Sequence, residues 1–272
     1  MSLADSLFLW SLLGNPARAA LAPSLRVEAA GGWAQGLPYP ALEASFKVKE
    51  DAGAEIRLLP LALFSSSAEH SVRDEERLVD VIHQKTEMRS WALVGRWGRR
   101  WQGFLFGLEA GAALAQLSDE FWSDSGVLYE PVSVQGGAKA LSGGAGAVWE
   151  GPVRLGAWAR HWKELGGERT QSEVNDFVSR KTLVPWAPAA GLGTELGMSA
   201  EKGPFGLTLL WAGQIGVFAE YSSTWFGMRL GWAQAPGAWA WARYERRPWS
   251  LGLRLGYWRR PSFQVSAGYF VP

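Results

Sequence analysis

The sequence predicts an all-β protein: an antiparallel up-and-down transmembrane β-barrel of about 14 strands, with a short N-terminal helix plugging its lumen. Three observations lead to this prediction. Residues 224–272 alternate between large apolar and small or charged side chains with a period of two. The second face of these segments carries Gly, Ala and Arg. The chain has 17 Trp and 33 Gly, and Trp or Tyr often stands at a segment end.

The alternation is clearest near the C-terminal end of the sequence. In residues 226–232 every even position is large and apolar, and every odd position is Gly or Arg. In residues 249–257 the odd positions are apolar, with Ser, Gly and Arg between them. Successive side chains leave a strand on opposite faces, so this spacing indicates strands. Four such segments joined by short turns predict an antiparallel meander.

The side chains between the apolar positions indicate a membrane barrel. A sheet with one face in water carries mainly Lys, Glu, Thr and Ser on that face. Gly and Ala with occasional Arg are instead typical of a crowded polar lumen, with the apolar side chains facing lipid and aromatic residues at both interfaces.

Composition narrows the class of protein further. Lys and Arg total 27 and Asp and Glu total 26, so the net charge of +1 argues against a general nucleic-acid binder. The absence of cysteine excludes disulfides and cysteine-based metal sites. No apolar run approaches the ~18–20 residues that a spanning helix needs.

The N-terminal residues predict a helix that lies inside or under the barrel. Residues 2–13 contain no Gly or Pro, Ser2 and Asp5 resemble a capping box, and Pro16 cannot continue the helix. A second short turn is expected over residues 16–21. The division is therefore a helical plug at 1–23 and a barrel at 24–272. The apolar stretch 6–13 lacks the basic residues that precede a signal core, so we expect a presequence to have been removed.

The segment Leu-Ala-Asp-Ser-Leu-Phe at 3–8, followed by Asn15, Pro16 and Ala17 directly before the first strand, resembles the long-chain fatty-acid transporter family of outer-membrane barrels and its scaffold-type relatives. In that family the Asn-Pro-Ala segment belongs to a hatch inside a 14-stranded barrel. The resemblance implies that Asn15, Pro16 and Ala17 form part of a plug, and that the barrel admits a small apolar molecule passively.

Strands are expected throughout the rest of the chain, and Pro60 suggests a bulge or bend in one of them. Three long polar stretches, at 65–87, 115–128 and 163–185, are predicted as loops. Residues 132–149 are interpreted as two strands around Ser142-Gly143-Gly144, with one long bent strand as the alternative. With two strands, the loop 163–185 would lie at the end of the barrel that has the short turns. With one strand, the loop would lie at the opposite end, as expected for a long loop, but the number of strands would be odd.

Charged residues on the predicted inward phase should line the lumen, because an arginine facing lipid at mid-bilayer costs ~2–4 kcal/mol. They either form a polar conduit or pair with one another, and pairing is favoured. The predicted lumen-lining residues are Arg26, Glu28, Glu43, Lys47, Arg57, Arg96, Glu109, Arg154, Arg160, Glu195, Arg229, Arg243 and Arg254.

Catalysis finds little support in the sequence. His70 and His83, with Asp74, Glu75 and Asp80, are candidates for a metal site or a Ser-His-acid group, but solvated loop charge is favoured because no nucleophile motif accompanies them. The Trp and Arg residues of 239–260 largely occupy different faces, which argues against stacking on nucleic acid or sugar. We expect no enzyme activity, no cofactor and no metal.

The predicted function is passive passage of small hydrophobic molecules through a bacterial outer membrane. One alternative is a non-conducting structural or anchoring barrel that binds another cell-envelope protein. A second is a soluble Trp-rich β-barrel binding protein. The expected partners are the lipid bilayer and either a small hydrophobic ligand or another envelope protein, with no nucleic acid.

Overall fold

A computed structural model describes residues 14–34, 36–74, 77–124, 132–174, 179–185, 193–213, 215–232, 236–246, 248–258 and 260–271. The predicted helix at residues 2–13 lies outside the described residues. Within the described residues no helix is long and apolar enough to cross a membrane.

One short helix and fifteen strands make up the described part of the chain. The 3-10 helix η1 covers Pro16–Leu21, as the predicted short turn requires. The strands are β1 (Leu25–Ala34), β2 (Leu37–Lys49), β3 (Ala52–Asp74), β4 (Arg77–Trp101), β5 (Phe104–Ser123), β6 (Val132–Glu150), β7 (Arg154–Val174), β8 (Ser179–Pro185), β9 (Thr194–Lys202), β10 (Phe205–Trp211), β11 (Ile215–Ser222), β12 (Phe226–Trp232), β13 (Pro236–Arg246), β14 (Trp249–Trp258) and β15 (Arg260–Val271).

The strands form a closed antiparallel barrel. Each ring strand pairs with its neighbours in sequence, β1 pairs with β15, and pairing between β6 and β7 completes the ring. Among the described strands, β8 pairs with the far part of β7 alone, and β9 takes its place in the ring. Of the fifteen strands, fourteen therefore close the barrel, which confirms the predicted strand number.

The interpretation of residues 132–149 as two strands was wrong. They form the single strand β6, paired without a break to β5 from Val132 to Trp149. The predicted loop at 163–185 consequently follows a strand that runs away from the short turns. It belongs to the end of the barrel opposite those turns.

The three predicted polar loops are largely strands. Strands β3 and β4 pair to Asp74 and Arg77, β5 continues to Ser123, and β7 continues to Val174. Polar side chains suit both faces of a sheet that stands in water, so polarity alone did not mark the strand ends. Pro60 does lie at a bulge, because the β3–β4 register shifts between Pro60 and Ala62.

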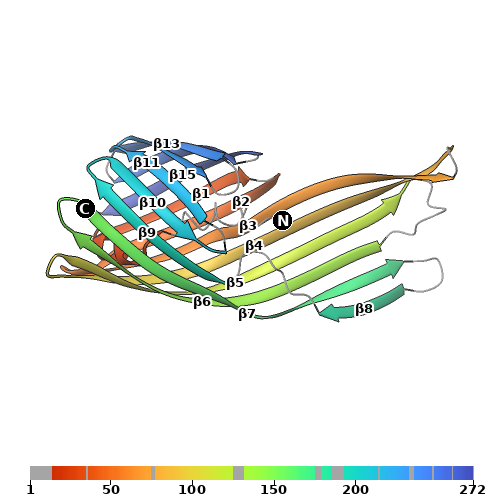
Figure 1. The fold of residues 1–272 in the computed structure, drawn as a ribbon, viewed down its shortest axis with the longest axis horizontal. Helices are drawn as coiled ribbons and strands as arrows, with labels where there is room; N and C mark the ends of the chain where they lie inside the picture. The colour runs from red at the N-terminus through yellow and green to blue at the C-terminus, as the bar shows by residue number, and fades with distance from the viewer. Residues whose placement is uncertain are drawn as a thin grey trace.

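The barrel wall is tall on one side and short on the other (Figure 1). The tall wall is β3–β7, whose strands have 19 to 25 residues. The strands β9–β15 have 7 to 12. One end of the barrel, the short-turn end, carries the connections at 50–51, 102–103, 151–153, 203–204 and 223–225. The tall wall extends beyond the short wall at the opposite end.

Most large apolar side chains face outward, as the alternation predicts. Trp232, Leu253 and Val265 are 59%, 44% and 53% exposed. Trp239 and Trp241 of β13 instead line the lumen with Arg254, so the prediction that the Trp and Arg residues of 239–260 lie on different faces was wrong for these two. Exposed aromatic residues mark both ends of the outer surface. Trp101, Phe104 and Trp149 lie side by side at the short-turn end, and Trp33 stands near the other end.

Candidate functional site

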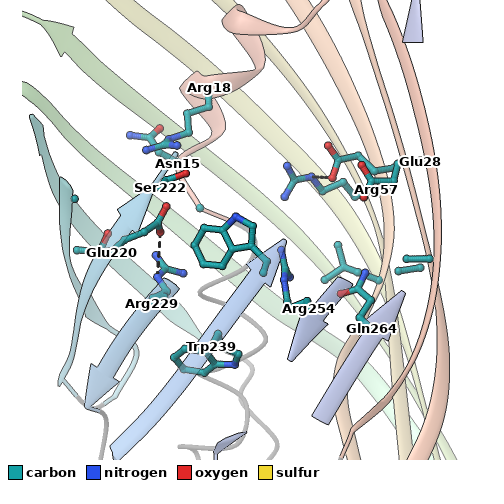
Figure 2. A pocket seen from close by; sticks show the side chains of 18 of the residues that line it. Asn15, Arg18, Glu28, Arg57, Glu220, Ser222, Arg229, Trp239, Arg254 and Gln264 are labelled. Atoms are coloured by element: carbon teal, nitrogen blue, oxygen red, sulfur yellow. Dashed lines mark ion pairs between the residues drawn. The ribbon is translucent and has the colours of Figure 1, made fainter. Parts of the chain in front are cut away.

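A cavity of about 600 Å³ lies in the barrel lumen (Figure 2). Side chains from η1, from β1–β4, from β7 and from β9–β15 line it. They include charged residues such as Arg57 and Arg254 and aromatic residues such as Trp158 and Trp239.

One inward row of the barrel ladder carries a buried chain of charges. Cross-strand partners share a face, so the register aligns Glu55 (β3), Arg96 (β4), Glu109 (β5), Gly144 (β6), Arg160 (β7) and Glu195 (β9). All of these charged residues are buried, and Glu195 is 0% exposed. Acid and base alternate along the row, which is the arrangement that buried charge requires.

Each charge in the row has an oppositely charged partner. Arg96 Nε donates to Glu109 Oε2 at 2.7 Å, and Arg160 Nη1 donates to both Glu195 oxygens at 2.9 Å. Arg160 also donates to both oxygens of Glu109. Trp158 Nε1 also donates a hydrogen bond to Glu195 Oε1 at 2.8 Å. These residues therefore form a fixed ionic network rather than free charge along a conduit.

Gly144 explains how charges on β5 and β7 meet across β6. It is the direct partner of both Glu109 and Arg160. A Cβ there would stand 3.4 Å from the Arg160 Cβ. A larger side chain would occupy the space through which Arg160 reaches Glu109.

The same network holds the chain that enters the barrel. Arg160 Nη2 and Arg96 Nη2 donate to the Gly14 carbonyl oxygen at 3.2 and 3.4 Å. The next residue, Asn15, donates from Nδ2 to the carbonyl oxygens of Ala147 and Ala157 at 3.0 and 3.2 Å. Its Oδ1 accepts from the Ala17 N–H at 2.9 Å and begins η1.

Helix η1 rests on a socket of inward glycines. A Cβ at Gly53, Gly98, Gly107 or Gly146 would collide with Asn15 or with the η1 backbone. Helix η1 therefore packs against β3–β6 on the inner side of the wall. The predicted plug residues Asn15, Pro16 and Ala17 lie at this contact, and all three are buried.

An apolar cluster lies beyond the ionic row, away from the short turns. It joins inward side chains of the tall wall, such as Leu59, Val94 and Trp162, to Leu210, Phe218 and Trp239 of the short wall. The lumen therefore combines an apolar layer with the ionic network.

The remaining predicted lumen residues mostly form ion pairs across neighbouring strands. Arg57 pairs with Glu43 at 3.4 Å, and also with Glu55. Glu28 accepts from Arg243 at 3.1 Å and also pairs with Arg26. Arg229 pairs with Glu220 at 3.4 Å, and its guanidinium carbon lies 5.2 Å from the centre of the Phe218 ring.

Three predicted lumen residues differ from the others. Arg254 lines the cavity without an ion pair in the described part of the chain. Lys47 and Arg154 are exposed, and each lies near the short-turn end of its strand.

The sequence reasoning missed several charged partners. Glu55 shares the inward phase of β3 with Arg57, but the predicted strand began one residue later, at Ile56. Arg18 pairs with Glu201 from across the barrel, and Glu220 pairs with Arg229. Arg18 lies in η1, outside the alternating segments, so the period of two could not identify it as a lumen residue.

The β2–β3 ladder stops beside the cavity. Its last pair is Leu42 with Leu58, although both strands continue. Both residues line the cavity, together with Leu59 on the inner face. Further along, Leu63 of β3 packs against Leu37 and Ala34. We call the segment between the Leu42–Leu58 pair and Leu63 the β2–β3 break.

The histidines of the predicted metal or catalytic cluster lie in the extended tall wall. His83 Nε2 lies 2.8 Å from Asp124, Nδ1 lies 3.5 Å from Glu69, and the ring stacks on Trp122. Glu75 lies outside the described residues. Within the described ranges no group of three His, Asp or Glu side chains is placed to hold a metal ion.

Comparison with solved structures supports one fold. The toluene transporter TbuX of Ralstonia pickettii aligns with a TM-score of 0.58 over 96% of this chain and 92% of its own, at 11% identity. The toluene transporter TodX of Pseudomonas putida aligns at 0.56 over 95% and 91%, also at 11% identity. The translocator domain of the autotransporter NalP from Neisseria meningitidis aligns at 0.50 over 98% of both chains, at 14% identity.

The fold is that of bacterial outer-membrane β-barrels. At these identities the likeness concerns the fold and not the function. No protein-family model matches the chain, and no curated sequence matches it.

Proposed function

We propose that this chain is an outer-membrane channel through which small hydrophobic molecules pass without an energy source. The outward apolar belt faces the bilayer, and the short-turn end faces the periplasm, as short turns do in such barrels. The N-terminal residues with η1 act as the lumen plug, and the chain has no catalytic role.

One observation carries the proposal. The cavity is lined at the β2–β3 break both by Leu42 and Leu58, which stand on the outward phase, and by Leu59 on the inward phase. An apolar molecule in the lumen therefore finds apolar side chains continuing from the cavity to the lipid-facing surface. Such a path suits a hydrophobic cargo, because the cargo never leaves apolar surroundings.

The ionic network also favours a route sideways through the β2–β3 break over a route along the barrel axis. Arg96, Glu109 and Arg160 bond to one another, and both arginines also bond to the Gly14 carbonyl oxygen, so they offer no site to a neutral molecule on the axial route. The axial route toward the short turns is also narrowed by η1. The break is then the apolar way out of the cavity.

Uptake by whole cells tests the proposal. Cells with this chain in the outer membrane should accumulate labelled toluene faster than matched cells that carry a barrel of similar size without a lumen cavity. Equal rates at equal expression would contradict the proposal.

A second candidate function is a non-conducting barrel that anchors another envelope protein. The observation in its favour is the tall wall, which projects past the rest of the barrel (Figure 1). Chemical cross-linking in cells that recovers one stoichiometric envelope protein, together with unchanged toluene uptake, would select this alternative.

A further inference from the structure

Charged side chains line the cavity. They are five arginines and four glutamates, namely Arg18, Arg57, Arg96, Arg229 and Arg254 with Glu28, Glu43, Glu201 and Glu220. Charge away from water is costly unless it is paired, so the partners of each arginine matter.

Four of the five arginines have carboxylate partners. Arg96 binds Glu109 at 2.7 Å, and Arg18 pairs with Glu201. Arg57 and Arg229 are paired as described above. The Arg254 side chain makes no hydrogen bond or ion pair within the described part of the chain, and Figure 2 draws an ion pair to Arg229 and none to Arg254.

Arg254 has two other arginines of the cavity as neighbours. It lies near enough to Arg57 and Arg229 for their charges to repel its own. Its cross-strand neighbours are Trp241 and Gln264, which bring no negative charge. An anion that enters the cavity would relieve this repulsion and complete the donor set of Arg254.

Aromatic rings surround the same space. Tyr39, Trp158, Trp239 and Trp241 line the cavity from three different strands. Indole and phenol rings give a flat ligand large contact area, and offset or edge contacts between rings add to it. The site thus offers one guanidinium group, that of Arg254, and several aromatic rings for a flat ligand to pack against.

We propose that the cavity binds a small aromatic carboxylate, with its carboxylate on the Arg254 guanidinium and its ring against Trp239 and Trp241. A guanidinium fork matches the two oxygens of a carboxylate. This inference rests on the proposed function for the cavity itself and adds a second class of ligand there: an aromatic acid held by Arg254, beside the neutral molecules that the apolar path at the β2–β3 break suits.

Titration calorimetry on the detergent-solubilised full chain tests the inference with three ligands of similar size. Benzoate carries the charge, benzamide has the same shape without it, and toluene has only the ring. Benzoate should bind about tenfold or more tightly than benzamide, since hydrogen bonds to a charged group are the stronger ones. Arg254→Gln should remove that preference and leave toluene binding unchanged, and Arg254→Lys should keep part of it.

Arg246→Gln is the matched control. Arg246 is the last residue of β13, is exposed, and does not line the cavity. It should leave all three affinities unchanged. If Arg254→Gln does not fold, as judged by circular dichroism, the wild-type comparison of benzoate with benzamide and the Arg254→Lys variant decide.

Two results overturn the inference. One is equal binding of benzoate and benzamide to the wild type; the other is a benzoate preference that survives Arg254→Gln. Toluene binding in either case leaves the proposed function standing. Failure of all three ligands to bind overturns both.

Discussion

The guanidinium of Arg160 donates to the carbonyl oxygen of Gly14, 146 residues earlier in the chain, at 3.2 Å. The same guanidinium binds Glu109 on β5 and Glu195 on β9. One side chain therefore ties together both sides of β6, the seam between β7 and β9, and the segment that begins η1. The ionic row and the placement of η1 form one structure.

Replacing Arg160 by Met should strongly destabilise the barrel. The change leaves Glu195 buried with Trp158 Nε1 as its remaining donor and halves the partners of Glu109. Breaking a buried ion pair on one side costs about 3–5 kcal/mol. Urea unfolding in detergent micelles, followed by tryptophan fluorescence, measures the free energy of unfolding.

Arg100→Met is the control for this prediction. Arg100 pairs with Glu150 at 2.9 Å, but its side chain is largely exposed. An exposed pair contributes about 0–1 kcal/mol. A similar loss of unfolding free energy in both variants would show that burial of the ionic row does not determine how much its ion pairs stabilise the barrel.

The glycine socket makes a second prediction, at Gly107. Gly107→Ala places a Cβ against the backbone of Pro16 and Ala17, so η1 must move or the strand must bend. We expect a loss of about 1–3 kcal/mol, the usual cost of overpacking. Hydrogen exchange at the backbone amides of residues 17–21 should also become faster.

Gly143→Ala adds the same methyl group to the outer surface of β6. No atom lies within 4 Å of the added Cβ. This variant should keep wild-type stability and wild-type exchange in η1. Faster exchange in both variants would mean that strand flexibility, rather than the collision, is responsible.

Much of the barrel could be predicted from alternation alone. The apolar phase of residues 226–232 and 249–257 identified the outward face, and Arg229 and Arg254 on the other phase do lie inside. The periodicity is local, so a single sequence contains it. The predicted number of about 14 strands holds although residues 132–149 were interpreted as two strands. With β6 as one strand the ring has fourteen, so the odd count expected for that alternative was wrong.

The error at Ser142-Gly143-Gly144 has a physical reason. Glycine pairs usually signal turns. Here Gly144 is a glycine within a strand because Arg160 and Glu109 meet above it, and Gly143 is its outward neighbour. Only the three-dimensional partners of Gly144 distinguish this role from a turn.

The site itself could be predicted only in part. The inward phase identified Arg96, Glu109, Arg160 and Glu195, since each lies in an alternating segment. The contact between Arg243 and Glu28 joins residues 215 positions apart. The cavity and the β2–β3 break depend on such register between distant strands, which no local pattern contains.

The β2–β3 break makes a third prediction, about the route of the cargo. Ala41 and Leu59 would be the next partners if the ladder continued beyond Leu42 and Leu58. A disulfide between Ala41→Cys and Leu59→Cys should close the break and lower toluene uptake several-fold. The native chain has no cysteine, so the pair is the only one that can form. Reduction should restore the rate.

A second cysteine pair controls for cross-linking itself. Ala44 and Ile56 are already partners within the β2–β3 ladder. The disulfide between Ala44→Cys and Ile56→Cys should leave uptake unchanged. Unchanged uptake with a fully formed 41–59 disulfide would place the route elsewhere.

The turn between β2 and β3 gives a prediction about pH. Asp51 accepts a hydrogen bond from Arg99 Nε at 2.7 Å, and this bond with the nearby positive charge lowers the pKa of Asp51 below its ordinary value of 3.8. A lowered pKa in the folded state means that the pair stabilises the turn above pH 3.8, where the carboxylate is ionised in both states. That contribution is lost as the pH falls through the lower, folded pKa. Asp51 lies in a surface turn with 39% of its side chain exposed, so the effect belongs to the turn and not to the stability of the whole barrel. NMR titration of the Asp51 carboxyl carbon should show a midpoint below 3.8, and Arg99→Met should raise that midpoint toward 3.8. An unchanged midpoint in Arg99→Met would show that the Arg99 side chain does not hold the carboxylate in solution.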